Sequence, residues 1–138
     1  MYYTQTSIVV KNTHAKALED FYRENTRVLG DQPSVLDIKF AKRNSPREDG
    51  CSKYVLSIEW LHEMAVQEWH DSSAFRALEE KLDAVVPKET ILQEKTVGST
   101  VLVDYTQPKR QPRKSFFQER QEEQQQQEEE AQAAGLSH

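Results

Sequence analysis

The 138-residue sequence has few of the residues that form disulfides, bind phosphate groups or cross membranes. Its single cysteine, Cys51, excludes a disulfide within the chain and favours a reducing compartment. Its four glycines form no phosphate-binding loop, so nucleotide-dependent chemistry is not expected. No stretch approaches the roughly 20 apolar residues of a membrane span, and the N-terminus lacks the pattern of a secretory signal. We therefore expect a cytoplasmic protein that does not bind membranes.

Nucleic acids and metal ions are also poor partners for this composition. The net charge is -5, and binding of nucleic acid depends on neutralising phosphates with basic side chains. His62 and Glu63 begin like the zinc motif H-E-x-x-H, but Val66 stands where the second histidine belongs. The sequence holds no other cluster of histidine and cysteine. We expect neither nucleic acid nor a bound metal ion.

The composition changes near residue 106. Residues 1–106 carry nearly all the aliphatic and aromatic side chains, enough for one modest hydrophobic core. Residues 107–138 are rich in glutamine and glutamate and have no apolar stripe. Such a segment buries too little apolar surface to offset the entropy lost on ordering. The sequence predicts one globular domain over residues 1–106 and a disordered tail over 107–138.

Hydrophobic periodicity places four strands and two helices in the globular part. The helices cover residues 13–30 and 63–86, with an interruption near 71–73, and the strands cover 2–11, 35–43, 53–60 and 97–105. The order β-α-β-β-α-β is typical of the ferredoxin-like fold, an α+β class. We expect a four-stranded antiparallel sheet with helices on one face.

The other face of the sheet would then lack a cover. We expect this face to be apolar, and no further helix is available to bury it, so a second copy of the chain is the simplest partner. The sequence therefore predicts a homodimer that packs sheet on sheet. The residues assigned to this face are Thr6, Ile8, Val10, Val35, Val55, Ser57 and Leu102.

The orientation of the first strand determines which of its polar residues lie under the helices. One register turns Gln5 and Ser7 toward the helices, together with Tyr3 and Val9. Two polar side chains on a core-facing strand need partners, and a pocket that holds water or a ligand would supply them. The opposite register turns Tyr2, Thr4, Thr6 and Ile8 inward. Alternation favours the two registers about equally, and the candidate site below uses the first.

The element order, Trp60 at the end of the third strand, and Ser72 and Phe75 in the following helix resemble the antibiotic biosynthesis monooxygenase (ABM)-like family. The resemblance covers about residues 3–106. It implies a dimeric α/β barrel with a pocket between sheet and helices. Some enzymes of the family oxidise aromatic substrates without a cofactor, because the substrate anion itself reacts with oxygen.

A partial similarity to the haem-degrading branch of this family gives an alternative. That branch has an asparagine on strand one, a tryptophan that faces the haem, and a histidine that ligates iron. Their positions fall on Gln5, Trp69 and Glu79. The tryptophan is retained, but the imidazole ligand is replaced by a carboxylate, which is a poor proximal ligand. Haem is therefore the alternative cofactor, and no cofactor is the primary expectation.

These observations predict an ABM-like monooxygenase that modifies a small aromatic or polyketide-like substrate. A third hypothesis is a non-catalytic dimeric binding module, which a pocket filled by side chains would favour. His62 and His70 are the candidate bases, because a histidine titrates near neutral pH. The residues expected to bind substrate are Gln5, Ser7, Phe21, Trp60 and Trp69.

Overall fold

A computed structural model describes residues 1–44, 47–105 and 116–136, apart from the side chains of 116–119 and 134–136. The chain divides into two compact units, Met1–Asp104 and Tyr105–His138. The first unit holds the sheet and the helices that cover it, and the second holds a separate helix. The candidate site lies wholly within the first unit.

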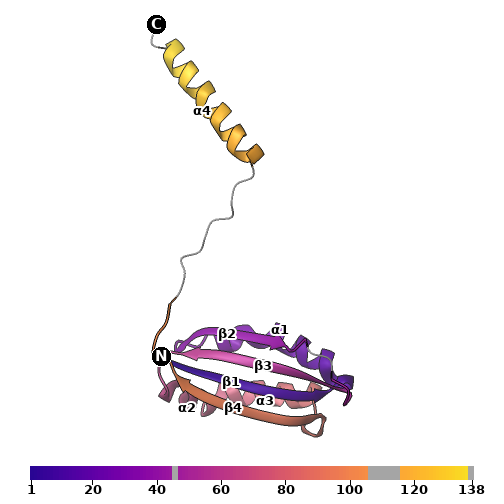
Figure 1. Cartoon of the computed structure of the whole chain (residues 1–138). Helices are drawn as coiled ribbons and strands as arrows, with labels where there is room; N and C mark the ends of the chain where they lie inside the picture. Colours follow the sequence, from indigo (N-terminus) through magenta and orange to yellow (C-terminus); the bar gives the residue numbers. More distant parts are fainter. Residues whose placement is uncertain (45–46, 106–115, 137–138) are drawn as a thin grey trace. The chain divides into compact units, whose positions relative to one another are not determined.

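The four strands form one antiparallel sheet in the order β2-β3-β1-β4 (Figure 1). The predicted ferredoxin-like α+β fold is therefore confirmed. The two central strands, β1 and β3, pair continuously from Tyr2 opposite Trp60 to Lys11 opposite Cys51. The strands are β1 (Tyr2–Lys11), β2 (Val35–Lys42), β3 (Cys51–Trp60) and β4 (Ile91–Thr100).

Three α-helices accompany the sheet: α1 (Ala15–Gly30), α2 (Met64–His70) and α3 (Ser73–Val85). Short 3-10 turns, Asn12–His14 and Lys88–Thr90, precede α1 and β4. The predicted interruption of the second helix is confirmed. The Ser72 hydroxyl donates to the Trp69 carbonyl over 2.6 Å and accepts from the Phe75 amide over 3.2 Å. One serine thus ends α2 and caps the start of α3.

The core lies between the sheet and the helices and has two parts. One is built around Val10, Leu18, Tyr54 and Val86, all of which are fully buried. The other surrounds Trp60 and lies next to α2 and α3. Its buried members are Leu29, Leu56, Ile58, Trp60, Ala65 and Trp69.

The face of β1 toward the helices is the one with Thr4, Thr6 and Ile8. The buried indole nitrogen of Trp60 donates to the Thr4 hydroxyl over 2.9 Å, so Thr4 must lie beside it. The prediction that Gln5 and Ser7 face the helices is wrong. Ile8, Val9 and Val10 are all buried, so alternation in this strand carries no signal about which face is inward.

The composition predicted for the uncovered sheet face changes accordingly. Four residues assigned to this face lie on the helix side instead. Three of them share the inward face of β1: Thr6, Ile8 and Val10. The fourth, Val35, packs in the part of the core around Trp60. Val55 and Ser57 pair with Ser7 and Gln5 and lie on the uncovered face, as predicted. Val97, opposite Gln5, joins them.

The last strand is also displaced from its predicted position. It was predicted over 97–105, and β4 instead covers Ile91–Thr100. Pairing with β1 sets these limits, because Thr100 lies opposite Tyr2 and Ile91 opposite Val10. Leu102 lies beyond the strand and is 90% exposed, so it is not part of the sheet. The sequence of β4 is polar and has no apolar alternation, so the pattern did not indicate a strand. Pairing with β1 holds β4 in the sheet.

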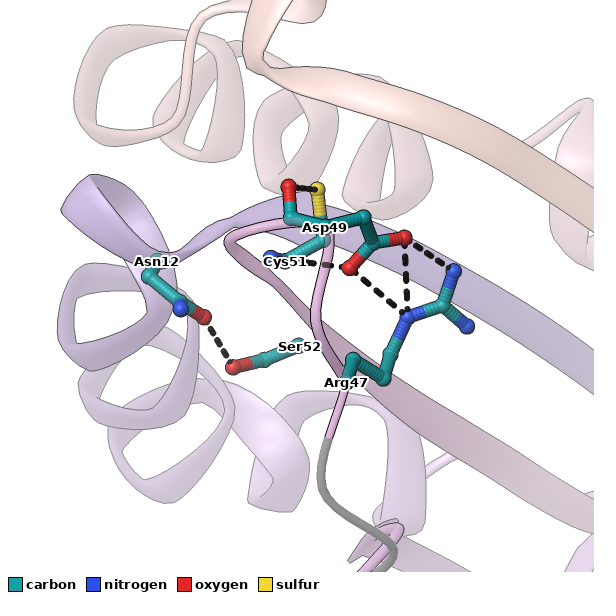
Figure 2. Close-up of polar contacts among 5 residues, drawn as sticks. All are labelled: Asn12, Arg47, Asp49, Cys51 and Ser52. Atoms are coloured by element: carbon teal, nitrogen blue, oxygen red, sulfur yellow. Dashed lines mark hydrogen bonds and ion pairs between the residues drawn. The ribbon is translucent and has the colours of Figure 1, made fainter.

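The turn before β3 is held by side chains from both sides of the loop (Figure 2). Arg47 Nη2 lies 2.6 Å from Asp49 Oδ2, and Asp49 Oδ1 accepts from the Cys51 amide over 3.2 Å. The Cys51 thiol donates to the Asp49 carbonyl and is buried. Ser52 donates to the Asn12 side chain over 2.6 Å. Cys51 is thus a structural residue at the start of β3.

An aromatic side chain covers a glycine at the end of the sheet near α2. Tyr2 lies over Gly98 on the neighbouring strand so closely that a methyl group at position 98 would collide with the ring and hydroxyl of Tyr2. Tyr2 also packs against the part of the core around Trp60. The missing side chain of Gly98 is therefore replaced by the ring of Tyr2.

The second unit contains helix α4 (Phe116–Leu136), where the sequence predicted disorder. Glutamine, glutamate and alanine have high helix propensity, and this favours a helix even without an apolar face. The side chains of residues 120–133 are exposed. Residues 106–115 of the tail lie outside the described residues. Within the described ranges, none of the helices combines the length and the apolar character needed to cross a membrane.

We predict that Thr4→Val destabilises the protein by about 1–3 kcal/mol, because the buried Trp60 N–H loses its acceptor while the shape of the side chain is kept. Chemical denaturation measures the free energy of unfolding. Thr96→Val is the matched control, since its exposed hydroxyl bonds to that of Thr6, and it should change stability by less than about 0.5 kcal/mol. Equal effects of the two substitutions would contradict the role given to Thr4.

Candidate functional site

A cavity of about 470 Å³ lies between the sheet and the helices. Its floor is the helix-facing side of the three strands β1, β3 and β4. Its walls come from α1, α2 and α3. This volume is within the range of roughly 300–1,000 Å³ that is usual for small-molecule sites. The first unit therefore contains enough space for a ligand of several fused rings.

One part of the cavity is aromatic. Trp60, at the end of β3, and Trp69, in α2, are both buried and line the cavity. The rings of Trp69 and Phe75 meet edge to face at 5.6 Å, and His70 stacks on Phe75 at 4.7 Å. Because Ser72 ends α2 and starts α3, it brings these rings together. Flat apolar walls of this kind suit a planar aromatic ligand.

The other part of the cavity is polar. The hydroxyls of Thr6 and Thr96 share a hydrogen bond of 2.9 Å, and Glu94 lies two residues along β4 from Thr96. Tyr22 of α1 lines the same part. Burial, and secondarily the negative charge of Glu94, raise the pKa of the Tyr22 hydroxyl to about 12. Tyr22 therefore stays protonated at neutral pH and is available as a donor.

Two exposed ionisable groups complete the lining. Glu79 comes from α3 and His70 from the last turn of α2. Glu79 is the position that the haem-degrading branch would fill with histidine. Within residues 1–44, 47–105 and 116–136, no three histidine, cysteine, aspartate or glutamate side chains converge as a metal site would require.

The structure brings four of the seven predicted site residues to the cavity. Phe21, Trp60, Trp69 and His70 line it. Gln5 and Ser7 do not, because β1 turns them to the uncovered face. His62 lies before α2, outside the cavity lining, and its Nδ1 accepts from the Ala65 amide over 3.2 Å. This bond gives His62 a role at the start of the helix.

Several lining residues were missed from the sequence. Thr4 and Thr6 belong to the alternative register of β1, so choosing that register would have found them. Glu94 and Thr96 lie in the part of β4 that was not recognised as a strand. Tyr22 follows Phe21 directly and lies at the boundary of two cavities, lining both. No pattern in the sequence separates such a position from an ordinary core residue.

Solved structures share this fold over most of the chain. A candidate antibiotic biosynthesis monooxygenase from Deinococcus radiodurans aligns with TM-score 0.62 and 10% identity, covering 79% of this chain and 100% of its own. SnoaB, a cofactor-independent oxygenase from Streptomyces nogalater, aligns with TM-score 0.56 and 13% identity, covering 77% and 97%. MhuD, a haem degrader from Mycobacterium tuberculosis, aligns with TM-score 0.57 and 15% identity, covering 77% and 100%.

These similarities confirm, at the level of the fold, the resemblance to the antibiotic biosynthesis monooxygenase-like proteins. No protein-family model matches the sequence, and no curated protein is significantly similar to it. The likeness lies in the arrangement of strands and helices, because 10–15% of residues are identical in these three alignments. Any conclusion about activity must therefore come from the cavity itself.

We predict that Glu94→Gln lowers the pKa of Tyr22 but leaves it above 10, because burial is the larger cause of its shift. A pKa raised in the folded state stabilises the protein fully below pH 10, and this contribution of about 2–3 kcal/mol is lost as the pH rises toward 12. In Glu94→Gln the loss should begin at the same pH, about 10, where the unfolded tyrosine titrates, but it should end at a lower pH and be smaller. Tyrosinate absorbance, compared with Tyr22→Phe, measures the pKa of Tyr22.

Glu80→Gln serves as the control for this titration, because Glu80 lies on α3 and does not line the cavity. It should leave the titration of Tyr22 unchanged. A Tyr22 midpoint that is the same in Glu94→Gln as in the parent protein would contradict the electrostatic contact with Glu94.

Proposed function

We propose that the protein oxidises a planar aromatic small molecule with molecular oxygen and without a bound cofactor. The observation that carries this proposal is a cavity of about 470 Å³ whose walls are aromatic and aliphatic and whose ionisable groups are few. Such a site holds a flat ligand and excludes most water from its rings. The fold shared with SnoaB, a cofactor-independent oxygenase, also supports oxidation without a bound cofactor.

The chemistry requires a substrate that forms an electron-rich anion. A ring CH₂ group that is conjugated through aromatic rings with a carbonyl on the opposite side loses one proton to a base of the protein. The resulting carbanion reduces oxygen, and a C–O bond forms to give a hydroperoxide after a proton returns. Loss of water converts the CH₂ group into a second carbonyl. The balance is one substrate and one O₂ giving one quinone and one water, so no external reductant is needed.

His70 is the base in this scheme. It lines the cavity and is exposed, and histidine is the side chain that most often serves as a general base. Phe75 stacks against the flat face of its ring, with the ring centroids 4.7 Å apart. Tyr22 would donate a hydrogen bond to the substrate carbonyl, whose oxygen gains negative charge as the proton leaves.

Haem is the second cofactor hypothesis, and the residues of the cavity do not fit it. Glu79 stands at the expected position of the iron ligand, and a carboxylate is a poor replacement for imidazole. The cavity lining contains two carboxylates, Glu79 and Glu94, and no lysine or arginine among the described residues that could pair with the haem propionates. The shared fold of MhuD is therefore not matched by a haem-binding set of side chains.

The open cavity also weighs against the third hypothesis, a non-catalytic dimeric binding module. A binding module without a ligand would be expected to fill the space under its helices with side chains. Here the space stays open although Trp60 and Trp69 are themselves buried. The cavity supports a small-molecule ligand, and turnover of that ligand distinguishes an enzyme from a binding protein.

The uncovered face of the sheet supports a homodimer, as part of the same proposal. Val55 lies on this face with Tyr3, and Val97 is 51% exposed there. A second sheet packed on this face would bury these side chains. The polar residues between them, Gln5, Ser7 and Ser57, would pair across the interface or with bridging water.

We predict that the protein converts anthrone to anthraquinone with uptake of one O₂ per molecule. Anthrone has three fused rings and the required CH₂ group opposite a carbonyl. An oxygen electrode and the anthraquinone absorbance report the reaction, and binding should quench the emission of the two tryptophans, which both line the cavity. His70→Gln should lower kcat about 100-fold, because a positioned base contributes roughly that factor or more.

His14→Gln is the matched control, since His14 lies before α1, bonds to Thr13 and does not line the cavity. It should turn over at the parent rate. Quenching without oxygen uptake would contradict the enzyme and leave a binding protein. Neither quenching nor uptake, with anthrone or with other three-ring ligands, would contradict the proposed function as a whole.

We predict that the parent protein is a dimer in native mass spectrometry and that Val55→Lys combined with Val97→Lys shifts it toward monomer, because two charges would be buried in the interface. Val28→Lys is the control, since Val28 is a 38% exposed side chain of α1, away from the sheet. A monomeric parent protein at micromolar concentration would remove the dimer from the proposal.

A further inference from the structure

The charges around the cavity are of one sign. Glu79 from α3 and Glu94 from β4 line it, and both are exposed, so they lie at its solvent-facing edge. With His70 neutral, the described lining carries two negative charges and no positive charge. In the part of the chain that the structure describes, neither carboxylate takes part in an ion pair. Among the described residues, no ion pair therefore neutralises the two carboxylates at the edge of the cavity.

Two basic side chains lie on the other side of Tyr22. Arg23 and Lys42 line a separate cavity of about 320 Å³, beside the edge strand β2. Both are held by Glu19, whose carboxylate lies 4.0 Å from Arg23 and 3.9 Å from Lys42. Glu19 also accepts a hydrogen bond from the Tyr54 hydroxyl over 2.9 Å. These cations are therefore partly neutralised and are separated from the aromatic cavity by the ring of Tyr22.

We propose that the aromatic cavity selects planar compounds that are cationic or neutral and rejects those with a carboxylate or another anionic group. This inference deepens the proposed function and rests on it, because it names the class of substrate for the same site. A ligand with a basic nitrogen would place that nitrogen toward Glu79 and Glu94 and its rings between Trp60 and Trp69. An acidic ligand of the same shape would meet two negative charges without a partner.

The chemistry of the proposed oxidation gives a second reason for a cationic substrate. Removal of a proton from the ring produces an anion, and Glu79 and Glu94 oppose that negative charge. A positively charged substituent between the carboxylates and the reacting ring offsets this repulsion. The substrate then passes through a zwitterion with no net charge. A site with two carboxylates is thus better suited to an aromatic compound with a basic, protonated nitrogen than to an aromatic acid.

The experiment compares three tricyclic probes of one shape by titration calorimetry on the full-length protein at low salt. The probes are 9-aminoacridine, a cation at neutral pH, acridone, which is neutral, and anthracene-9-carboxylate, an anion. We expect the cation to bind at least about tenfold more tightly than the anion, with the neutral compound between them. Raising the salt concentration to 0.5 M should reduce this ratio, because the carboxylates are exposed to solvent.

The double variant Glu79→Gln, Glu94→Gln should bring the three affinities close together. The control is Glu80→Gln, Glu89→Gln, which removes the same charge from exposed residues that do not line the cavity, and it should keep the preference for the cation. Equal or tighter binding of the anion would overturn the inference about charge, as would an unchanged preference in Glu79→Gln, Glu94→Gln. Neither result would contradict the proposed function. No binding of any probe would overturn the proposed function as well.

Discussion

The hydrogen bond between the Trp60 indole nitrogen and the Thr4 hydroxyl determines how the rest of the site is assembled. A buried N–H without an acceptor costs free energy, so Thr4 must face the helices. Because side chains alternate along a strand, Thr6 then faces the cavity and meets Thr96, and Gln5 turns to the opposite side. A slip of one residue would exchange the two faces of β1 and remove the polar part of the cavity.

The sequence predicted what periodicity and capping encode locally. The element order, the limits of β1 and the break at Ser72 were read correctly because each depends on neighbouring residues. The face of β1 and the position of β4 were not, because both depend on partners far along the chain: Trp60 for Thr4, and β1 for the polar strand β4. The sequence therefore predicted the aromatic residues of the site, which lie on helices and at the end of β3, and missed the polar residues on β1 and β4.

The cavity exists because the helices cover the sheet incompletely. Near Val10 and Leu18 the side chains are fully buried, whereas next to α2 the rings of Trp69 and Phe75 meet edge to face and line the open cavity together with Trp60. The short helix α2 and its serine termination hold these rings at fixed positions. A rigid aromatic chamber with an acidic rim follows from these local constraints, and it gives the fold a site whose chemistry its neighbours in structure need not share.

Tyr2 and Gly98 show how a glycine can be useful because of what it lacks. The ring of Tyr2 occupies the volume that a side chain at position 98 would need, so the two positions divide one space between them. Neither residue is free to change alone: a larger side chain at 98 displaces the tyrosine, and a smaller one at 2 leaves a gap beside the core around Trp60. Across related sequences, these two sites, 96 residues apart, should therefore vary as a pair.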